Sequence, residues 1–239
     1  MLTWRDLMWS VWRLLRLSFQ IVFHRKLLFM GGGILVYYAI LYALAVFRPG
    51  EGFSAIQALH ILVEAPGTVL AIYLTMDLVA GERDRDTLEV LFSTSASHYK
   101  IWMVRLLSVY VVLGVSLVAM STLSYFLFAE FLVVEGALNA FLPAFLVANL
   151  TFFFSVTFRS GNAAGMLSLG FLILILLASS SLRDTPYFLF LNPFDPPIGV
   201  DDTLWEDQVL VNRAGVAVLG CVLLFLALRR MEGRERLLS

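Results

Sequence analysis

Residues 101–128 read IWMVRLLSVYVVLGVSLVAMSTLSYFLF and contain one charged side chain, that of Arg105. A helix needs roughly 20 consecutive, mostly apolar residues to cross the hydrocarbon core of a bilayer. A run of this length, with a single charge near its beginning, predicts a helix that spans a membrane.

Five other apolar runs meet the same criterion, which gives six predicted spans. The spans are residues 27–47, 59–80, 101–128, 137–158, 162–182 and 209–228. Of the 239 residues in the chain, 60% are hydrophobic and 15% are charged, whereas soluble domains carry about 25% charged residues. We therefore expect an all-α integral membrane protein whose six-span transmembrane domain covers residues 27–239.

Lysine and arginine residues flank the predicted spans unevenly. If both termini lie in the cytoplasm, only Arg48, Arg183 and Arg213 fall outside, and the other 14 of the 17 basic residues fall inside. Basic residues are retained on the cytoplasmic side of membrane proteins. The sequence thus predicts cytoplasmic termini, a cytoplasmic loop at 81–99, an outer loop at 183–208, and a multi-pass protein of the plasma (inner) membrane.

Residues 1–26 precede the first span and have a pattern of their own. Trp4, Leu7, Met8 and Val11 recur at helical spacing, while arginines occupy another face. Tryptophan side chains favour the boundary between water and lipid. We expect an amphipathic interfacial helix on the cytoplasmic leaflet, with packing against a soluble partner as the alternative.

Several kinds of function have no residues to support them. The single cysteine, Cys221, excludes a disulfide framework and a thiolate metal cluster, and we expect it to be a packing residue within its span. A net charge of −1 gives no electrostatic case for a nucleic-acid partner. The chain has no G-x-x-x-x-G-K-[ST] motif, so it cannot hold ATP phosphates in a P-loop. We expect no catalytic residue, metal or cofactor on this chain.

The loop between the second and third spans is the most unusual polar stretch. Asp86 can cap a helix while Glu89, three residues later, reaches back to the amide of the cap. Leu88, Leu91 and Phe92 then share one face of that helix. The pattern predicts a short helix with apolar side chains facing the cytoplasm; a solvated, charged hairpin is the alternative.

This loop resembles that of permease subunits in the type-2 family of ATP-binding-cassette (ABC) exporters. Gly-Glu-Arg at 81–83 is followed by Thr-Leu-Glu at 87–89, a leucine and Ser-Thr, after the second of six spans. Asp86 and Ser95 stand where that family has glycine and proline. The resemblance implies a coupling helix that docks on a separate ATPase subunit. By position, the coupling residues are Glu82, Arg83, Asp86, Thr87, Leu88, Glu89, Leu91 and Phe92.

The second span contains three ionisable residues. His60 and Glu64 are four residues apart and should share a helix face near the outer end. Glu64 could line a substrate path or a dimer interface, or it could be an interfacial carboxylate that is either hydrated or bonded to His60. Asp77 lies about a turn from the cytoplasmic end and on nearly the opposite face, so we expect an anchor near the loop.

Proline and glycine interrupt the first two spans. Pro66-Gly67 follows Glu64 and could kink or break the second span, as polar cavities in membrane proteins often require. The run Gly31-Gly32-Gly33 in the first span allows either close approach of another helix or local flexibility.

The leading hypothesis is the permease subunit of an ATP-driven exporter. The resemblance implies two copies of an ATPase subunit, which hold the ATP and Mg²⁺, and a second permease half, either identical or a sister subunit. The alternative is a proton-coupled secondary transporter that uses Glu64 or Asp77.

Overall fold

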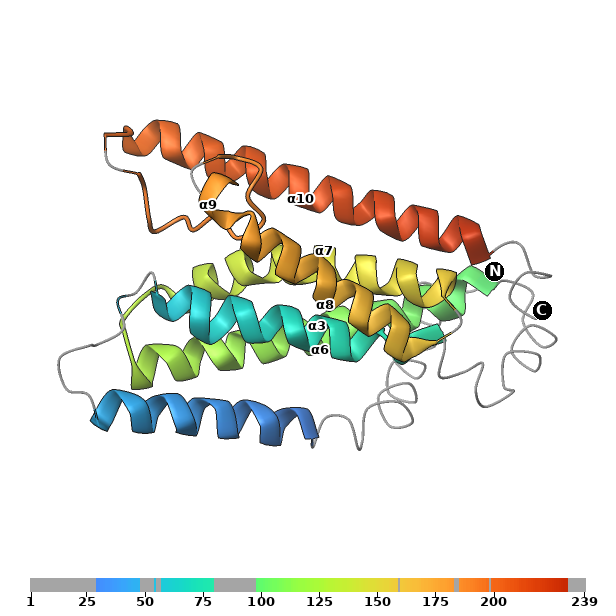
Figure 1. The fold of residues 1–239 in the computed structure, drawn as a ribbon, viewed down its shortest axis with the longest axis horizontal. Helices are drawn as coiled ribbons and strands as arrows, with labels where there is room; N and C mark the ends of the chain where they lie inside the picture. Colours follow the sequence, from blue (N-terminus) through green and yellow to red (C-terminus); the bar gives the residue numbers. More distant parts are fainter. Residues whose placement is uncertain are drawn as a thin grey trace, which may run out of the picture.

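The computed structural model describes residues 29–47, 54, 57–79, 98–158, 160–182, 185–197 and 199–231. Every regular element within these residues is a helix (Figure 1). The helices are a first helix Phe29–Phe47, the π-helix η1 (Ala58–Glu64), α3 (Ala65–Thr75), α6 (His98–Leu127), α7 (Val133–Thr157), α8 (Gly161–Leu177), α9 (Ser179–Leu182) and α10 (Asp202–Met231). The predicted leader helix 1–26 lies outside the described residues.

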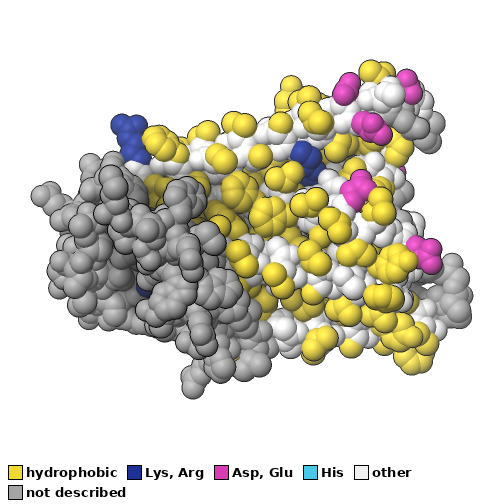
Figure 2. Space-filling model, turned by 180° about the vertical axis from the view of Figure 1, so that it is seen from behind, with side chains coloured by type: hydrophobic (Ala, Val, Ile, Leu, Met, Phe, Trp, Pro, Cys, Tyr) yellow, Lys and Arg dark blue, Asp and Glu magenta, His cyan; other side chains and the backbone are white. Residues whose placement is uncertain are grey.

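Five of these helices are long and apolar enough to cross a membrane. They are Phe29–Phe47, Ala58–Val79, Trp102–Leu127, Val133–Thr157 and Thr203–Met231. Helix α8 is apolar but shorter, with 17 residues. Hydrophobic side chains cover much of the described face in Figure 2, and acidic side chains gather at one end. The prediction of an all-helical chain is confirmed for the described residues, and the five long apolar helices are consistent with a multi-pass membrane protein.

Successive helices run in alternating directions along the bundle (Figure 1). Their turns therefore lie at two ends, which we name the loop end, where α3 is continued to Val79 and α6 begins at His98, and the opposite end. Helix α7 packs against α3, α6, α8 and α10. Its buried alanines, Ala137, Ala140, Ala144 and Ala148, form a narrow stripe that lets neighbouring helices approach closely.

A proline shapes the junction between η1 and α3. Pro66 has no backbone N–H, so it cannot donate to the carbonyl four or five residues earlier. Those two acceptors, Leu62 O and Ile61 O, receive hydrogen bonds from the hydroxyls of Tyr38 and Tyr37, each at 2.7 Å. The predicted break at Pro66 is therefore a change of helix type, from π to α, within one continuous helix.

The same two tyrosines attach the first helix to the bundle. Tyr38 is buried, and its oxygen also lies 2.9 Å from the hydroxyl of Ser124 on α6. By contrast, a Cβ added at Gly31, Gly32 or Gly33 would meet nothing within 4 Å. The glycine run is thus not a point of close approach to another described helix of this chain.

Asp77 lies at the loop end, against the beginning of α8. A Cβ on Gly161, the first residue of α8, would collide with the Asp77 carboxylate. Ser160 caps this helix through the Ala163 amide at 3.4 Å, and Ser155 of α7 donates to Met76 O at 2.8 Å. Asp77 therefore lies at the end of the helix where its position in the sequence placed it, and its role as an anchor stays a prediction.

Two expectations differ from the structure on α10. The helix begins at Asp202 and so includes the last residues of the predicted outer loop 183–208. Hydropathy marks only the part of a helix that lies in hydrocarbon, whereas an acidic residue at the beginning of the helix, such as Asp201, stabilises its first turn. Cys221, expected to pack inside the bundle, is exposed on the surface of α10.

Candidate functional site

Polar side chains from η1, α7 and α10 converge near the opposite end of the bundle. His60 Nδ1 lies 3.0 Å from Glu64 Oε2, so the two residues share a face as their spacing predicts. Glu64 is completely buried, whereas His60 retains 40% of its side-chain exposure. The carboxylate is therefore buried within the described bundle and bonded to His60, as one of the two alternatives for this residue expects.

Arg213 of α10 is the basic partner of this carboxylate. Its Nη2 lies 3.8 Å from Glu64 Oε1 and donates to Leu191 O at 2.8 Å. Nε donates to Asn139 Oδ1 of α7 at 3.3 Å, and Nη1 donates to Leu189 O at 3.4 Å. One guanidinium thus joins η1, α7, α10 and the segment that precedes α10. We call His60, Glu64 and Arg213 the charge cluster.

The segment 185–191 is fixed over the charge cluster by a neighbouring side chain. Asn212 Nδ2 donates to Pro186 O and to Phe188 O, each at 2.8 Å. Phe188, Leu189, Phe190 and Leu191 are buried, and the Phe190 ring meets His60 edge to face at 5.7 Å. The charge cluster therefore connects helices that could cross a membrane to an irregular segment at their end.

The charge cluster is an expensive arrangement for a protein interior. Burying two charges costs several kcal/mol per ion before their attraction is counted. Glu64 Oε1 is buried and has no hydrogen-bond partner among the described atoms. Ionisable groups at membrane depth commonly mark transport paths or moving contacts. The geometry suits an ion pair that opens and closes, because Arg213 keeps three other acceptors when Glu64 departs.

Sequence reasoning found His60 and Glu64 but missed Arg213. We counted Arg213 as an outer-side residue, although residue 213 falls inside the predicted span 209–228. A signal was present, because two opposite charges in different spans are expected to pair in a low-dielectric interior. Asn139 and Asn212 gave no such signal, since neutral amides occur at many positions in membrane helices.

The structure separates the two carboxylates of the second span. Glu64 contacts Arg213 near the opposite end, whereas Asp77 lies against Gly161 at the loop end. Within the described part of the chain, no three His, Cys, Asp or Glu side chains are grouped as a metal site would require. The expected coupling residues lie outside the described residues; they are Glu82, Arg83, Asp86, Thr87, Leu88, Glu89, Leu91 and Phe92.

No protein-family model, no curated protein and no solved structure matches the chain. The likeness to exporter permeases therefore depends on the loop motif and the order of the spans alone.

Proposed function

We propose that this chain is the membrane-spanning permease subunit of an ABC exporter. The observation that supports the proposal is the position of the motif in the chain, between two described helices. Residues 82–92 connect the helix that ends at Val79 to the helix that begins at His98. A separate ATPase subunit that grips this connection would act directly on two membrane helices.

The proposal includes six membrane crossings with both termini in the cytoplasm of a plasma (inner) membrane. Helix α8 supplies the remaining crossing, because 17 residues reach the lower limit for a span and α9 extends it. The charges support this orientation. Arg229 and Arg230 lie in the last turn of α10 at the loop end, while Glu206 and Asp207 lie in its second turn near the opposite end.

A mechanical route connects the two ends of the bundle. The helix Ala58–Val79 is continuous for 22 residues, and it carries Glu64 near one end and meets the loop at the other. A displacement of the loop would move this helix along its axis or tilt it. Either motion changes the distance from Glu64 to Arg213, which holds the 185–191 segment. The charge cluster is thus the contact through which the ATPase subunit would move the 185–191 segment at the opposite end of the bundle.

Co-purification in a mild detergent tests the proposal. The tagged chain should retain an ABC ATPase subunit, two copies for each pair of permease halves. Leu88→Asp with Leu91→Asp should abolish retention, because the substitutions place charge on the apolar face that docks. Leu132→Asp is the matched control, since Leu132 is 68% exposed in the turn at the opposite end. Absence of any ATPase from the wild-type preparation would refute the proposal.

One observation favours a second candidate, a proton-coupled secondary transporter. Glu64 is buried beside His60 and one of its oxygens accepts no hydrogen bond, so the carboxylate could carry a proton across the closed site. The two candidates differ in their energy source. Transport by the secondary transporter stops with an uncoupler and ignores ATP, whereas transport by the exporter in proteoliposomes requires ATP and survives the uncoupler.

A further inference from the structure

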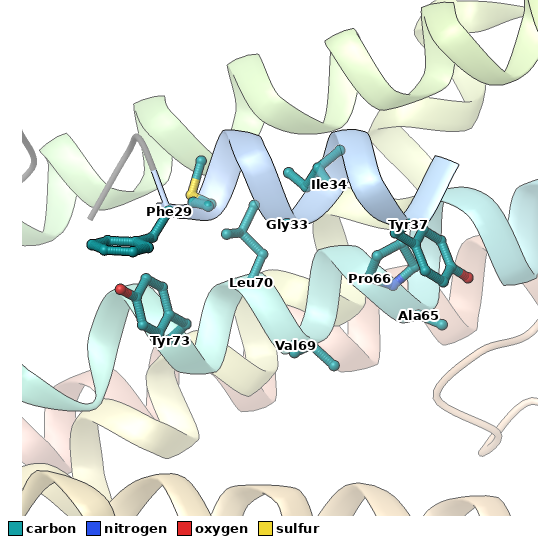
Figure 3. Close-up of a pocket in the computed structure, with 10 residues that line it drawn as sticks. Phe29, Gly33, Ile34, Tyr37, Ala65, Pro66, Val69, Leu70 and Tyr73 are labelled. Atoms are coloured by element: carbon teal, nitrogen blue, oxygen red, sulfur yellow. The ribbon is translucent and has the colours of Figure 1, made fainter. Parts of the chain in front are cut away.

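A groove of about 630 Å³ separates the first helix from α3. Its lining comes from both helices, with Phe29 and Tyr73 at one end and Tyr37 and Pro66 at the other (Figure 3). Because Phe29 begins the first helix and Tyr73 lies close to the end of α3, the groove occupies the half of the bundle nearer the loop end. We call it the lateral groove.

The helix contacts already described explain why the lateral groove is open. Tyr37 and Tyr38 fix the first helix to the η1–α3 junction, at one end of the groove. Towards the loop end, Gly33 faces α3 without a side chain to fill the space, and a Cβ there would meet no atom within 4 Å. The two helices are therefore in contact at the tyrosines and are separated at Gly33, which has no side chain to fill the space between them.

The lining of the lateral groove selects an apolar occupant. No charged side chain lines it, and the Tyr37 hydroxyl is already bonded to Ile61 O at 2.7 Å. Phe29 and Val69, which border it, are 77% and 52% exposed, as is usual for side chains that face lipid in a membrane-spanning helix. An empty groove there would forfeit the contacts that close packing provides, so hydrocarbon from the bilayer should enter it.

The dimensions argue against a second protein chain as the occupant. The groove is lined by ten residues, whereas a stable protein–protein interface takes roughly 20–30 residues from each side. A single flexible chain of methylene groups does not need an interface of that size.

We propose that the lateral groove is a binding site for one acyl chain of a membrane phospholipid. The chain lies between the first helix and α3, with Phe29 and Tyr73 at the mouth nearer the loop end. This lipid would fill the gap between the first helix and α3 and so support the first helix in its position. The inference requires only that the chain is in a bilayer, and it is independent of the ATPase.

Photolabelling in phosphatidylcholine vesicles tests the proposal. The full-length protein is reconstituted with a trace of phosphatidylcholine that carries a diazirine on one acyl chain, illuminated, and mapped by mass spectrometry. Residues 29–37 and 65–73 should be labelled several-fold more than the lipid-exposed surface of α10 around Val218 and Val222, which are 63% and 46% exposed.

Two variants fill the lateral groove without removing a contact. Val69→Trp and Gly33→Leu should each lower labelling of both segments to the level of α10, while Val118→Trp on the exposed face of α6 should not. Equal labelling of groove and α10 in the wild type would overturn the proposal. So would a covalent dimer formed efficiently through Val69→Cys in a Cys221→Ser background, because a second copy would then occupy the groove.

Discussion

At the scale of single residues, the charge cluster is the feature that sets this bundle apart. Glu64 is fully buried, with His60 Nδ1 3.0 Å and Arg213 Nη2 3.8 Å from its two carboxylate oxygens. Glu64 and Arg213 come from positions 149 residues apart in the sequence, on η1 and α10. Both helices pack on α7, and the ion pair links them across it. The cost of burying the charges is offset only while both partners are present.

Removing the cation should therefore destabilise the protein strongly. Arg213→Met leaves the Glu64 carboxylate buried without a counter-charge, and the free energy of unfolding should fall by about 3–5 kcal/mol. Adding Glu64→Gln to this variant should recover part of the loss, because the uncompensated charge disappears. Reversible unfolding in mixed micelles measures both values.

Arg230→Met is the matched control for this pair, because Arg230 is an exposed arginine of the same helix. Its free energy of unfolding should stay within about 0.5 kcal/mol of the wild type. If Arg213→Met and Arg230→Met are equally stable, or if the double variant loses the sum of the single losses, Glu64 and Arg213 do not interact.

At the scale of elements, the junction of η1 and α3 depends on contacts from another helix. Tyr38 Oη is 2.7 Å from Leu62 O and 2.9 Å from Met120 O. Ser124 also donates to Met120 O at 2.9 Å, so the single tyrosine proton is available for Leu62 O. The carbonyl that Pro66 leaves without an amide is satisfied by a residue 24 positions earlier.

A double-mutant cycle tests whether the Tyr38 hydroxyl donates to Leu62 O in place of the backbone N–H that Pro66 lacks. Tyr38→Phe should lower the free energy of unfolding by about 1–3 kcal/mol, since it leaves the buried Leu62 carbonyl without a donor. In a Pro66→Ala background the loss should be smaller, because the backbone N–H that the alanine restores can donate to Leu62 O. An equal loss in both backgrounds would show that Tyr38 acts only through its other contacts.

The contact between α8 and the end of α3 gives a second element-scale prediction. Gly161→Ala should lower the free energy of unfolding by about 1–3 kcal/mol, since the new methyl group collides with Asp77 and nears Met76 O at 3.1 Å. Gly170→Ala on the same helix meets nothing within 4 Å and should raise stability by up to about 1 kcal/mol. The reverse order of the two stabilities would disprove the contact.

Hydropathy and helical spacing predicted the apolar helices and the His60–Glu64 contact, because both depend on residues close together in the sequence. They could not predict the π-helix at 58–64, whose hydrogen bonds depend on tyrosines from another helix. They also gave no partner for Glu64, because pairing between spans depends on how the helices pack. Nor did they place the beginning of α10, since a helix continues beyond the hydrocarbon where capping and charge favour it.

At the scale of the whole molecule, the proposal requires that successive helices cross the membrane in opposite directions. Residues 82–92 and both chain termini must then lie on the cytoplasmic side. Single cysteines in a Cys221→Ser background should report this with a membrane-impermeant maleimide. Glu130→Cys and Asp207→Cys should react in intact cells, whereas Ser97→Cys and Arg230→Cys should react only after the membrane is opened. Labelling of Ser97→Cys from outside would show that the orientation is the reverse of the proposed one. Labelling of Glu130→Cys and Asp207→Cys on different sides would show that one of the two proposed spans between them does not cross the membrane.

The most direct test of the central claim, that a separate ATPase grips residues 82–92, is site-specific crosslinking in the membrane. A photoreactive amino acid at position 91 should crosslink to an ABC ATPase subunit, with a yield that changes between ATP-bound and nucleotide-free membranes. The same amino acid at position 132 should give no such product. An ATPase crosslink absent from position 91, or equally strong from position 132, would contradict the account.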